Sequence, residues 1–180
     1  MDAVIIFGAN HTMHMEGGSI GDWDAYRTPL GDVKVDTVLA NKIRTASPLI
    51  ESIPDVHRYE HSVEVQIPFI QTVLPDVPIV PVVLGNLSYD ECKQIARAVA
   101  VSAGGKKVLL VASSDMSHYP NYQNAYKVDA KILKAVGKYK PKGVWSLSFS
   151  LLRDNVPGLD CALCGKHALV TVMLASKELG

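Results

Sequence analysis

Three short apolar runs alternate along the chain with segments of helical periodicity. The runs Ala3–Phe7, Ile79–Leu84 and Val108–Ala112 are rich in β-branched residues and contain no charged side chain. Runs of this length and composition predict strands that are buried on both faces, as in a parallel sheet covered by helices. The mixed segment 22–35 is interrupted by Pro29 and Gly31, which predicts a short hairpin that supplies further strands.

Apolar positions at helical spacing predict six helices. They cover residues 36–45, 60–74, 88–102, 121–138, 141–154 and 161–179. Asp36 is a favourable N-cap, Ser88 and Glu91 have the spacing of a capping box, and Pro141 occupies a tolerated first-turn position. Pro68 lies inside the second of these segments, where a proline predicts a kink or a restart of the helix.

Strands that alternate with helices predict an α/β fold. We expect a three-layer sandwich with a largely parallel central sheet flanked by helices. A length of 180 residues suits one domain, 1–180. The segment Thr12–Gly21 is polar and rich in glycine, and we expect it to be a loop.

The charge balance argues against nucleic acid and membranes as partners. Lys plus Arg number 18 and Asp plus Glu also number 18, so no excess of basic charge is present. No apolar run approaches the ~18 residues that a membrane span needs. The N-terminus lacks the basic region of a signal peptide. Neither a G-x-S-x-G elbow nor a nucleotide-binding glycine motif is present.

The cysteines indicate a reducing compartment. Cys92, Cys161 and Cys164 form an odd set without the regular spacing of a disulfide framework, and we expect a cytoplasmic protein. Cys161 and Cys164 make a C-x-x-C, but the second pair of a structural zinc site is missing. Cys164 either opens the last helix as a thiol of lowered pKa, or both cysteines are small buried residues of a helix face.

Two of the predicted strands run directly into polar side chains. The first is followed by Gly8-Ala-Asn-His11, and the third by Ser113-Ser-Asp-Met-Ser-His118. Ligands of open α/β sheets bind beyond the carboxyl ends of the strands, so His11, Asp115 and His118 are expected in one crevice. Asp115 and His118 can act as an acid/base pair, or the polar residues of this segment can bond the backbone of a turn.

A second candidate pair opens the helix predicted at 60–74. His61 and Glu64 are three residues apart, so a helix places them on one face, where they can bind a metal ion or transfer a proton. The alternative is a helix start with acidic residues that favour the positive end of the helix dipole. The other histidines, His14, His57 and His167, are interpreted as surface or loop residues.

Five strings occur in a characteristic order along nearly the whole chain. They are Gly8-Ala-Asn-His11, Arg27-Thr-Pro-Leu-Gly31, Glu60-His-Ser-Val-Glu-Val-Gln-Ile-Pro-Phe69, Ser113-Ser-Asp-Met-Ser-His118 and Cys164-Gly165. Together they resemble the Memo family, also described as AmmeMemoRadiSam system protein B. The resemblance implies a fold like that of class III extradiol dioxygenases, which are non-haem iron enzymes. The animal member mediates cell motility linked to receptor tyrosine kinase signalling.

The resemblance also implies a site. His11 and Cys164 match a histidine and the cysteine of the family's metal-binding cluster, while His61, Asp115 and His118 match residues that line the same pocket. The family's other histidine lies in an upstream P-H-A-G motif that this sequence lacks, and the family's final strands are lacking too. The chain therefore resembles a family core shortened at both ends. His61 or water is expected to replace the lacking ligand.

Two functions follow as hypotheses. The first is a metal-dependent redox enzyme with iron, copper or zinc held by His11, His61 and Cys164. In this hypothesis His118, Asp115 and His61 are the catalytic groups. The second is a non-catalytic module that binds a peptide or a small ligand in the same pocket, since convergent polar groups support either function.

Overall fold

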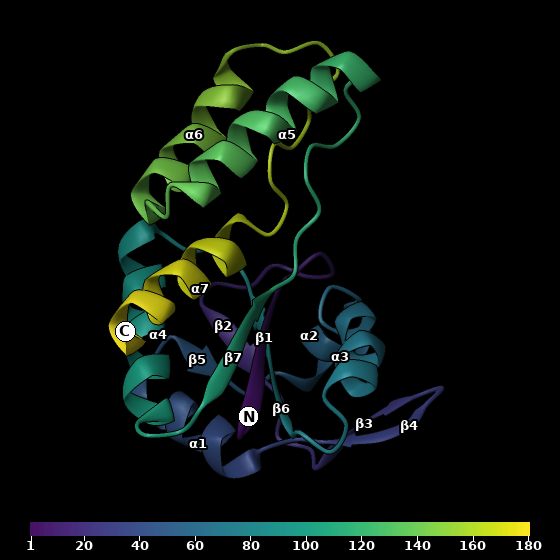
Figure 1. Ribbon diagram of the computed structural model, residues 1–180, viewed down its shortest axis with the longest axis vertical. Helices are drawn as coiled ribbons and strands as arrows, with labels where there is room; N and C mark the ends of the chain where they lie inside the picture. Colours follow the sequence, from purple (N-terminus) through teal and green to yellow (C-terminus); the bar gives the residue numbers. More distant parts are fainter.

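Helices cover both faces of a mixed sheet, and a further helical pair stands beyond one end of it (Figure 1). The computed structural model describes all residues, 1–180. The strands are β1 (Ala3–Ala9), β2 (Gly18–Ile20), β3 (Ala25–Thr28), β4 (Gly31–Lys34), β5 (Ile50–Glu51), β6 (Ile79–Leu84) and β7 (Val108–Ala112). The helices are α1 (Thr37–Ala46), α2 (Pro54–Arg58), α3 (Ile67–Val73), α4 (Tyr89–Ala103), α5 (Tyr122–Gly137), α6 (Pro141–Arg153) and α7 (Lys166–Leu179), with a 3-10 turn η1 (Glu64–Gln66).

The main sheet has five strands in the order β5-β2-β6-β1-β7. The central strand β1 pairs in parallel with β6 on one side and with β7 on the other. β2 runs antiparallel to β6 and parallel to β5, while β3 and β4 form a separate hairpin. This arrangement confirms the predicted α/β sandwich with a largely parallel central sheet, and it also confirms the hairpin predicted within 22–35.

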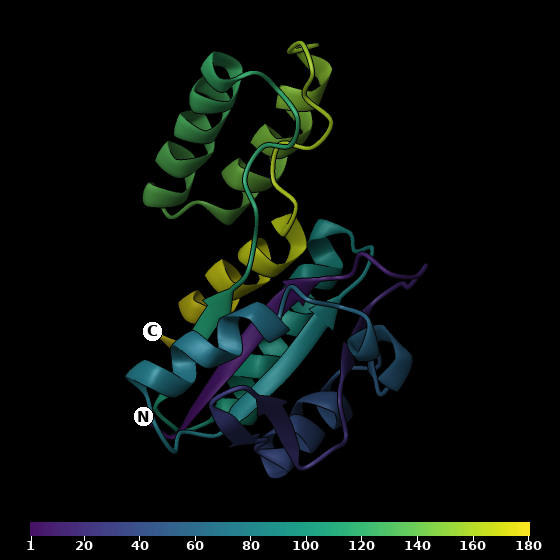
Figure 2. The ribbon, with the colours of Figure 1, turned by 90° about the vertical axis from the view of Figure 1, so that its right-hand side faces the viewer.

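Side chains of β1 point alternately into the two layers that flank the sheet. Ile5 and Phe7 pack in a core with residues of α1, α4 and α7, whereas Val4 and Ile6 pack against α2, α3 and the β3–β4 hairpin. All four side chains are fully buried. The uninterrupted apolar run of β1 is therefore explained by helical layers on both of its faces (Figure 2).

α5 and α6 pack on each other and, through α6, on α7. In Figure 1 this pair stands beyond the ends toward which β1 and β7 run. Asn121 caps α5 by accepting the backbone N–H of Asn124 at 3.0 Å. None of the helices in the structure is both long enough and apolar enough to cross a membrane.

Three sequence predictions need correction. β7 is an edge strand, and Leu109 on it is 36% exposed, so the prediction of burial on both faces was wrong. The helix predicted at 60–74 is shorter, because residues 60–63 form a turn ahead of η1 and α3, and α3 restarts next to Pro68. The last helix begins at Lys166 instead of Cys161. The short elements β2, β5 and α2 were not predicted.

The start of α7 lies directly against the loop that follows β7. The Gly165 N–H donates to Ser114 Oγ at 2.8 Å, and a methyl group at Gly165 would overlap the Ser113 carbonyl oxygen and the Ser114 side chain. Gly165 therefore permits a close approach that no larger residue allows.

We expect Gly165→Ala to destabilise the protein by about 1–3 kcal/mol, because the new methyl group would overlap the backbone carbonyl oxygen of Ser113, which can move only if the main chain shifts. Urea unfolding followed by circular dichroism measures this. Gly137→Ala is the matched control, since a methyl group there meets nothing within 4 Å, and its effect should be neutral or stabilising by up to ~1 kcal/mol. Equal stability of the two variants would contradict the proposed close contact.

Candidate metal centre

The structure brings His11 and Cys164 into direct contact, although 153 residues separate them. His11 lies just after β1, and Cys164 lies just before α7, at the carboxyl-end rim of the sheet. His11 Nε2 is 2.8 Å from Cys164 Sγ. The crevice expected from the ends of the strands therefore contains an imidazole and a thiol side by side.

A buried carboxylate holds the other side of the His11 ring. Glu60 Oε2 accepts the backbone N–H of His11 at 2.6 Å, and Glu60 Oε1 lies 3.0 Å from His11 Nδ1. Oε1 also accepts the backbone N–H groups of His61 and Ser62, each at 2.9 Å. Because the carboxylate has four N–H partners, both of its oxygens are occupied.

The charge of Glu60 determines the tautomer of His11. Burial alone raises the pKa of Glu60, but hydrogen bonds from Ser62 and His11 outweigh it, and the net pKa is below the ordinary value. An ionised carboxylate only accepts hydrogen bonds, so His11 Nδ1 carries the proton that it donates. The lone pair of a neutral His11 ring is then on Nε2, which faces Cys164.

Cys164 remains a neutral thiol in these surroundings. Burial raises its pKa to about 11, and the negative charges of Cys161, Asp115 and Glu60 add to the rise. Both sequence interpretations of Cys164, an activated thiol that opens the last helix and a small buried residue of a helix face, were wrong. α7 begins only at Lys166, so Cys164 lies outside the helix. Its thiol is thus the donor toward His11 Nε2.

His61 completes a group that can hold a metal ion. One donor atom from each of His11, Glu60 and His61 lies within 4.8 Å of the others. The His61 ring stacks on the His11 ring with a centroid separation of 5.3 Å, and its side chain is 66% exposed. The expected helical pairing of His61 with Glu64 was wrong, because His61 lies in a turn before η1.

Hydrogen bonds between uncharged groups join residues 62–66 to the ends of β1 and β7. Ser62 Oγ donates to the carbonyl oxygen of Ala9 at 2.7 Å, at the end of β1. Gln66 Nε2 donates to Ser113 Oγ at 3.0 Å, just beyond β7. Ser62 and Gln66 therefore fix the position of this segment next to the carboxyl ends of both strands.

His118 lines a cavity of about 440 Å³ together with His11, Cys161 and Cys164. Its backbone N–H donates to the Cys161 carbonyl oxygen at 2.9 Å. The ring atom Nε2 is buried, has no hydrogen-bond partner and lies 3.7 Å from Asp115 Oδ2. The Asp115 side chain is 81% exposed, and the backbone carbonyl of Asp115 accepts the Cys164 N–H at 3.3 Å. The two residues are neighbours without a direct hydrogen bond.

Two histidines that were interpreted as surface or loop residues lie in helices and are buried or half-buried. His57 is buried in α2 between Ser19 Oγ at 3.1 Å and Tyr26 Oη at 3.3 Å, and burial lowers its pKa to about 4. His167 is half-buried on α7, where burial also lowers its pKa to about 4. Both rings are therefore neutral at physiological pH. His14 is exposed, as expected.

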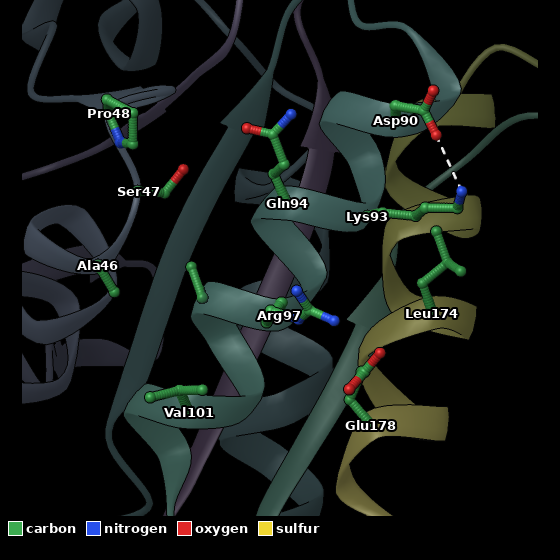
Figure 3. A pocket seen from close by; sticks show the side chains of 11 residues that line it. Ala46, Ser47, Pro48, Asp90, Lys93, Gln94, Arg97, Val101, Leu174 and Glu178 are labelled. Carbon is green, nitrogen blue, oxygen red and sulfur yellow. Dashed lines mark hydrogen bonds and ion pairs between the residues drawn. The ribbon is translucent and has the colours of Figure 1, made fainter.

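The best-formed groove outside this site contains neither of the two donor types, imidazole and thiol. The groove in Figure 3, of about 640 Å³, crosses α4 between the end of α1 and α7. Its charged side chains include the pair Lys93 and Asp90, 2.8 Å apart, but no histidine or cysteine lines it. A third hollow of about 360 Å³ is lined by Trp23, Tyr26 and His57. Glu60 also lines this hollow and belongs at the same time to the group of His11, Glu60 and His61.

We expect Glu60→Gln to destabilise the protein at neutral pH by about 1.5–3 kcal/mol, since the ionised carboxylate accepts several buried N–H groups. The folded pKa lies below the ordinary value of 4.5, so this stabilisation is complete above that pH and is lost as the pH falls through the depressed value. Urea unfolding from neutral to acid pH should show the difference between wild type and variant shrinking. Glu64→Gln, an exposed carboxylate of the same segment, is the control. A constant difference across this range would argue against an ionised Glu60.

Comparison with known proteins identifies the family. The family model described as Memo-like protein matches residues 1–180. A MEMO1 family protein of Sulfolobus acidocaldarius is 32% identical over 99% of this chain and 61% of its own length, and one of Methanococcoides burtonii is 33% identical over 99% and 65%. A third, of Methanosarcina barkeri, is 34% identical over 99% and 64%. The chain thus spans 61–65% of the length of these relatives. The resemblance found in the sequence is confirmed, and this chain belongs to the Memo family.

Proposed function

We propose that this protein holds a transition-metal ion between His11, His61 and Cys164 and uses it in redox chemistry on a small molecule in the adjacent cavity. The observation that carries the proposal is the contact of His11 Nε2 with Cys164 Sγ. Glu60 holds the other ring nitrogen of His11, Nδ1, and so fixes the orientation of the ring. Three free thiols favour a reducing compartment, and we place this activity in the cytoplasm.

The donor atoms fit such an ion. Imidazole nitrogen and thiolate sulfur are ligands of copper, zinc and iron. Metal-binding histidines commonly donate their other ring N–H to a carboxylate, which is the relation of His11 Nδ1 to Glu60. We therefore assign Glu60 a positioning role, because its oxygens already accept four N–H groups.

The remaining residues have roles on the substrate side. A bound metal ion would supply Lewis-acid or electron-transfer chemistry. His118 lines the cavity, and its buried Nε2 has no partner in the protein, so we assign the His118 ring proton exchange with a bound ligand. Asp115, at 3.7 Å, is close enough to stabilise a protonated His118. The exposed His61 ring stacks on His11 and does not line the cavity, so we assign it to the metal ion.

Ligand binding without catalysis is the second candidate. The exposure of Asp115 and the absence of a direct hydrogen bond to His118 favour it, because neither group is held in a fixed orientation for proton transfer. In this alternative the same cavity accepts a small molecule or a peptide segment.

The metal site is tested by elemental analysis of protein purified without added metal, and by Co²⁺ titration, in which thiolate ligation produces a charge-transfer absorption band. We expect wild type to bind metal, and His11→Ala and Cys164→Ala to lose affinity by at least ~10-fold, with the band absent in Cys164→Ala. His14→Ala is the matched control, since His14 is an exposed histidine of the same loop.

Unchanged metal content in His11→Ala and Cys164→Ala would overturn the proposed site. If the site holds metal, oxygen consumption with catechols tests the reaction class. Bound metal without oxygen consumption by any catechol would reject the dioxygenase-like activity and favour the binding module.

A further inference from the structure

Cys161 is a thiol that the proposed metal site does not use. It lines the same cavity as His11 and Cys164, and both Cys161 and Cys164 are only half-buried. The third cysteine, Cys92, is fully buried on α4. All three are free thiols, so the accessible thiols of this protein are the two members of one C-x-x-C.

The backbone around the two cysteines is anchored on one loop. The His118 N–H donates to the carbonyl oxygen of Cys161 at 2.9 Å, and the Cys164 N–H donates to the carbonyl oxygen of Asp115 at 3.3 Å. Between them the chain bends at Ala162 and then turns at Cys164 into α7. Both sulfurs therefore start from a short, curved segment held at its two ends.

The spacing of the two cysteines suits reversible closure, because two intervening residues are the spacing of C-x-x-C dithiols that cycle between thiol and disulfide.

We propose that Cys161 and Cys164 are a redox-active dithiol that closes to a disulfide in the presence of a low-molecular-weight disulfide such as oxidised glutathione. One cysteine thiolate attacks a glutathione sulfur and releases the first glutathione thiol. The other cysteine then attacks the mixed disulfide and releases the second. Two protein thiols are oxidised to one disulfide, and one glutathione disulfide is reduced to two thiols.

The closure controls metal binding, and this step rests on the proposed function. A Cys164 sulfur bonded to Cys161 is no longer a thiolate that can bind an ion beside His11 Nε2. Oxidation therefore weakens binding, and a metal ion already bound protects Cys164 from oxidation. Disulfides of cytosolic proteins are typically transient and of this regulatory kind.

The test uses the full chain after reduction and metal removal by a chelator. Incubation with oxidised glutathione, thiol alkylation under denaturing conditions and peptide mapping by mass spectrometry should show three free thiols falling to one, with a Cys161–Cys164 crosslink. Cys161→Ser should acquire only a glutathione adduct at Cys164. Cys92→Ser should still form the crosslink. Separate glutathione adducts on Cys161 and Cys164 without a crosslink, or no modification of either, would overturn the proposal.

Metal titration separates this proposal from the function on which it rests. Zn²⁺ should bind oxidised wild type at least ~10-fold more weakly than reduced wild type, and reduced Cys161→Ser should bind it like reduced wild type. If the crosslink forms and the Zn²⁺ affinity does not change, the redox-active dithiol is supported, but Cys164 is not a ligand of the metal site. Cys164-dependent Zn²⁺ binding without any crosslink would retain the metal site and overturn the dithiol.

Discussion

The buried carboxylate of Glu60 is the group on which the rest of the site depends. A charge removed from water is costly unless hydrogen bonds and opposite charge replace its hydration. Here the replacements are N–H groups of His11, His61 and Ser62. Since 49 residues separate Glu60 from His11, one carboxylate joins two distant loops and orients the imidazole at the same time.

The hydrogen bonds that Glu60 accepts also explain why residues 60–63 are not helical. Glu60 Oε1 accepts the backbone N–H of the next two residues, His61 and Ser62, and so bends the chain back on the side chain. Ser62 and Gln66 then bond the ends of β1 and β7. A helical reading of the apolar spacing could not include these contacts, because they join segments far apart in the sequence.

The parts of the fold that the sequence predicts are those with a strong local signal. β1 and β6 are apolar throughout, and α4 has both a helical stripe and the capping box of Ser88 and Glu91. β2 and β5 contain three and two residues, too few for any periodicity. The edge position of β7 depends on how many strands pair with it, which its own composition does not encode. His11 and Cys164 were predicted to converge through strand ends and resemblance, whereas the role of Glu60 needed the folded chain.

The sheet order explains why the chemistry collects where it does. β1 lies between β6 and β7, but the chain leaves β1 toward β2, on the β6 side, and leaves β7 toward α5. The two connections diverge, and a crevice opens between neighbouring parallel strands at their carboxyl ends. α7 packs back on β1 and β7, and its start brings Cys164 into that crevice. The absent methyl group of Gly165 allows this approach, so the position of the thiol depends on a glycine as well as on the sheet.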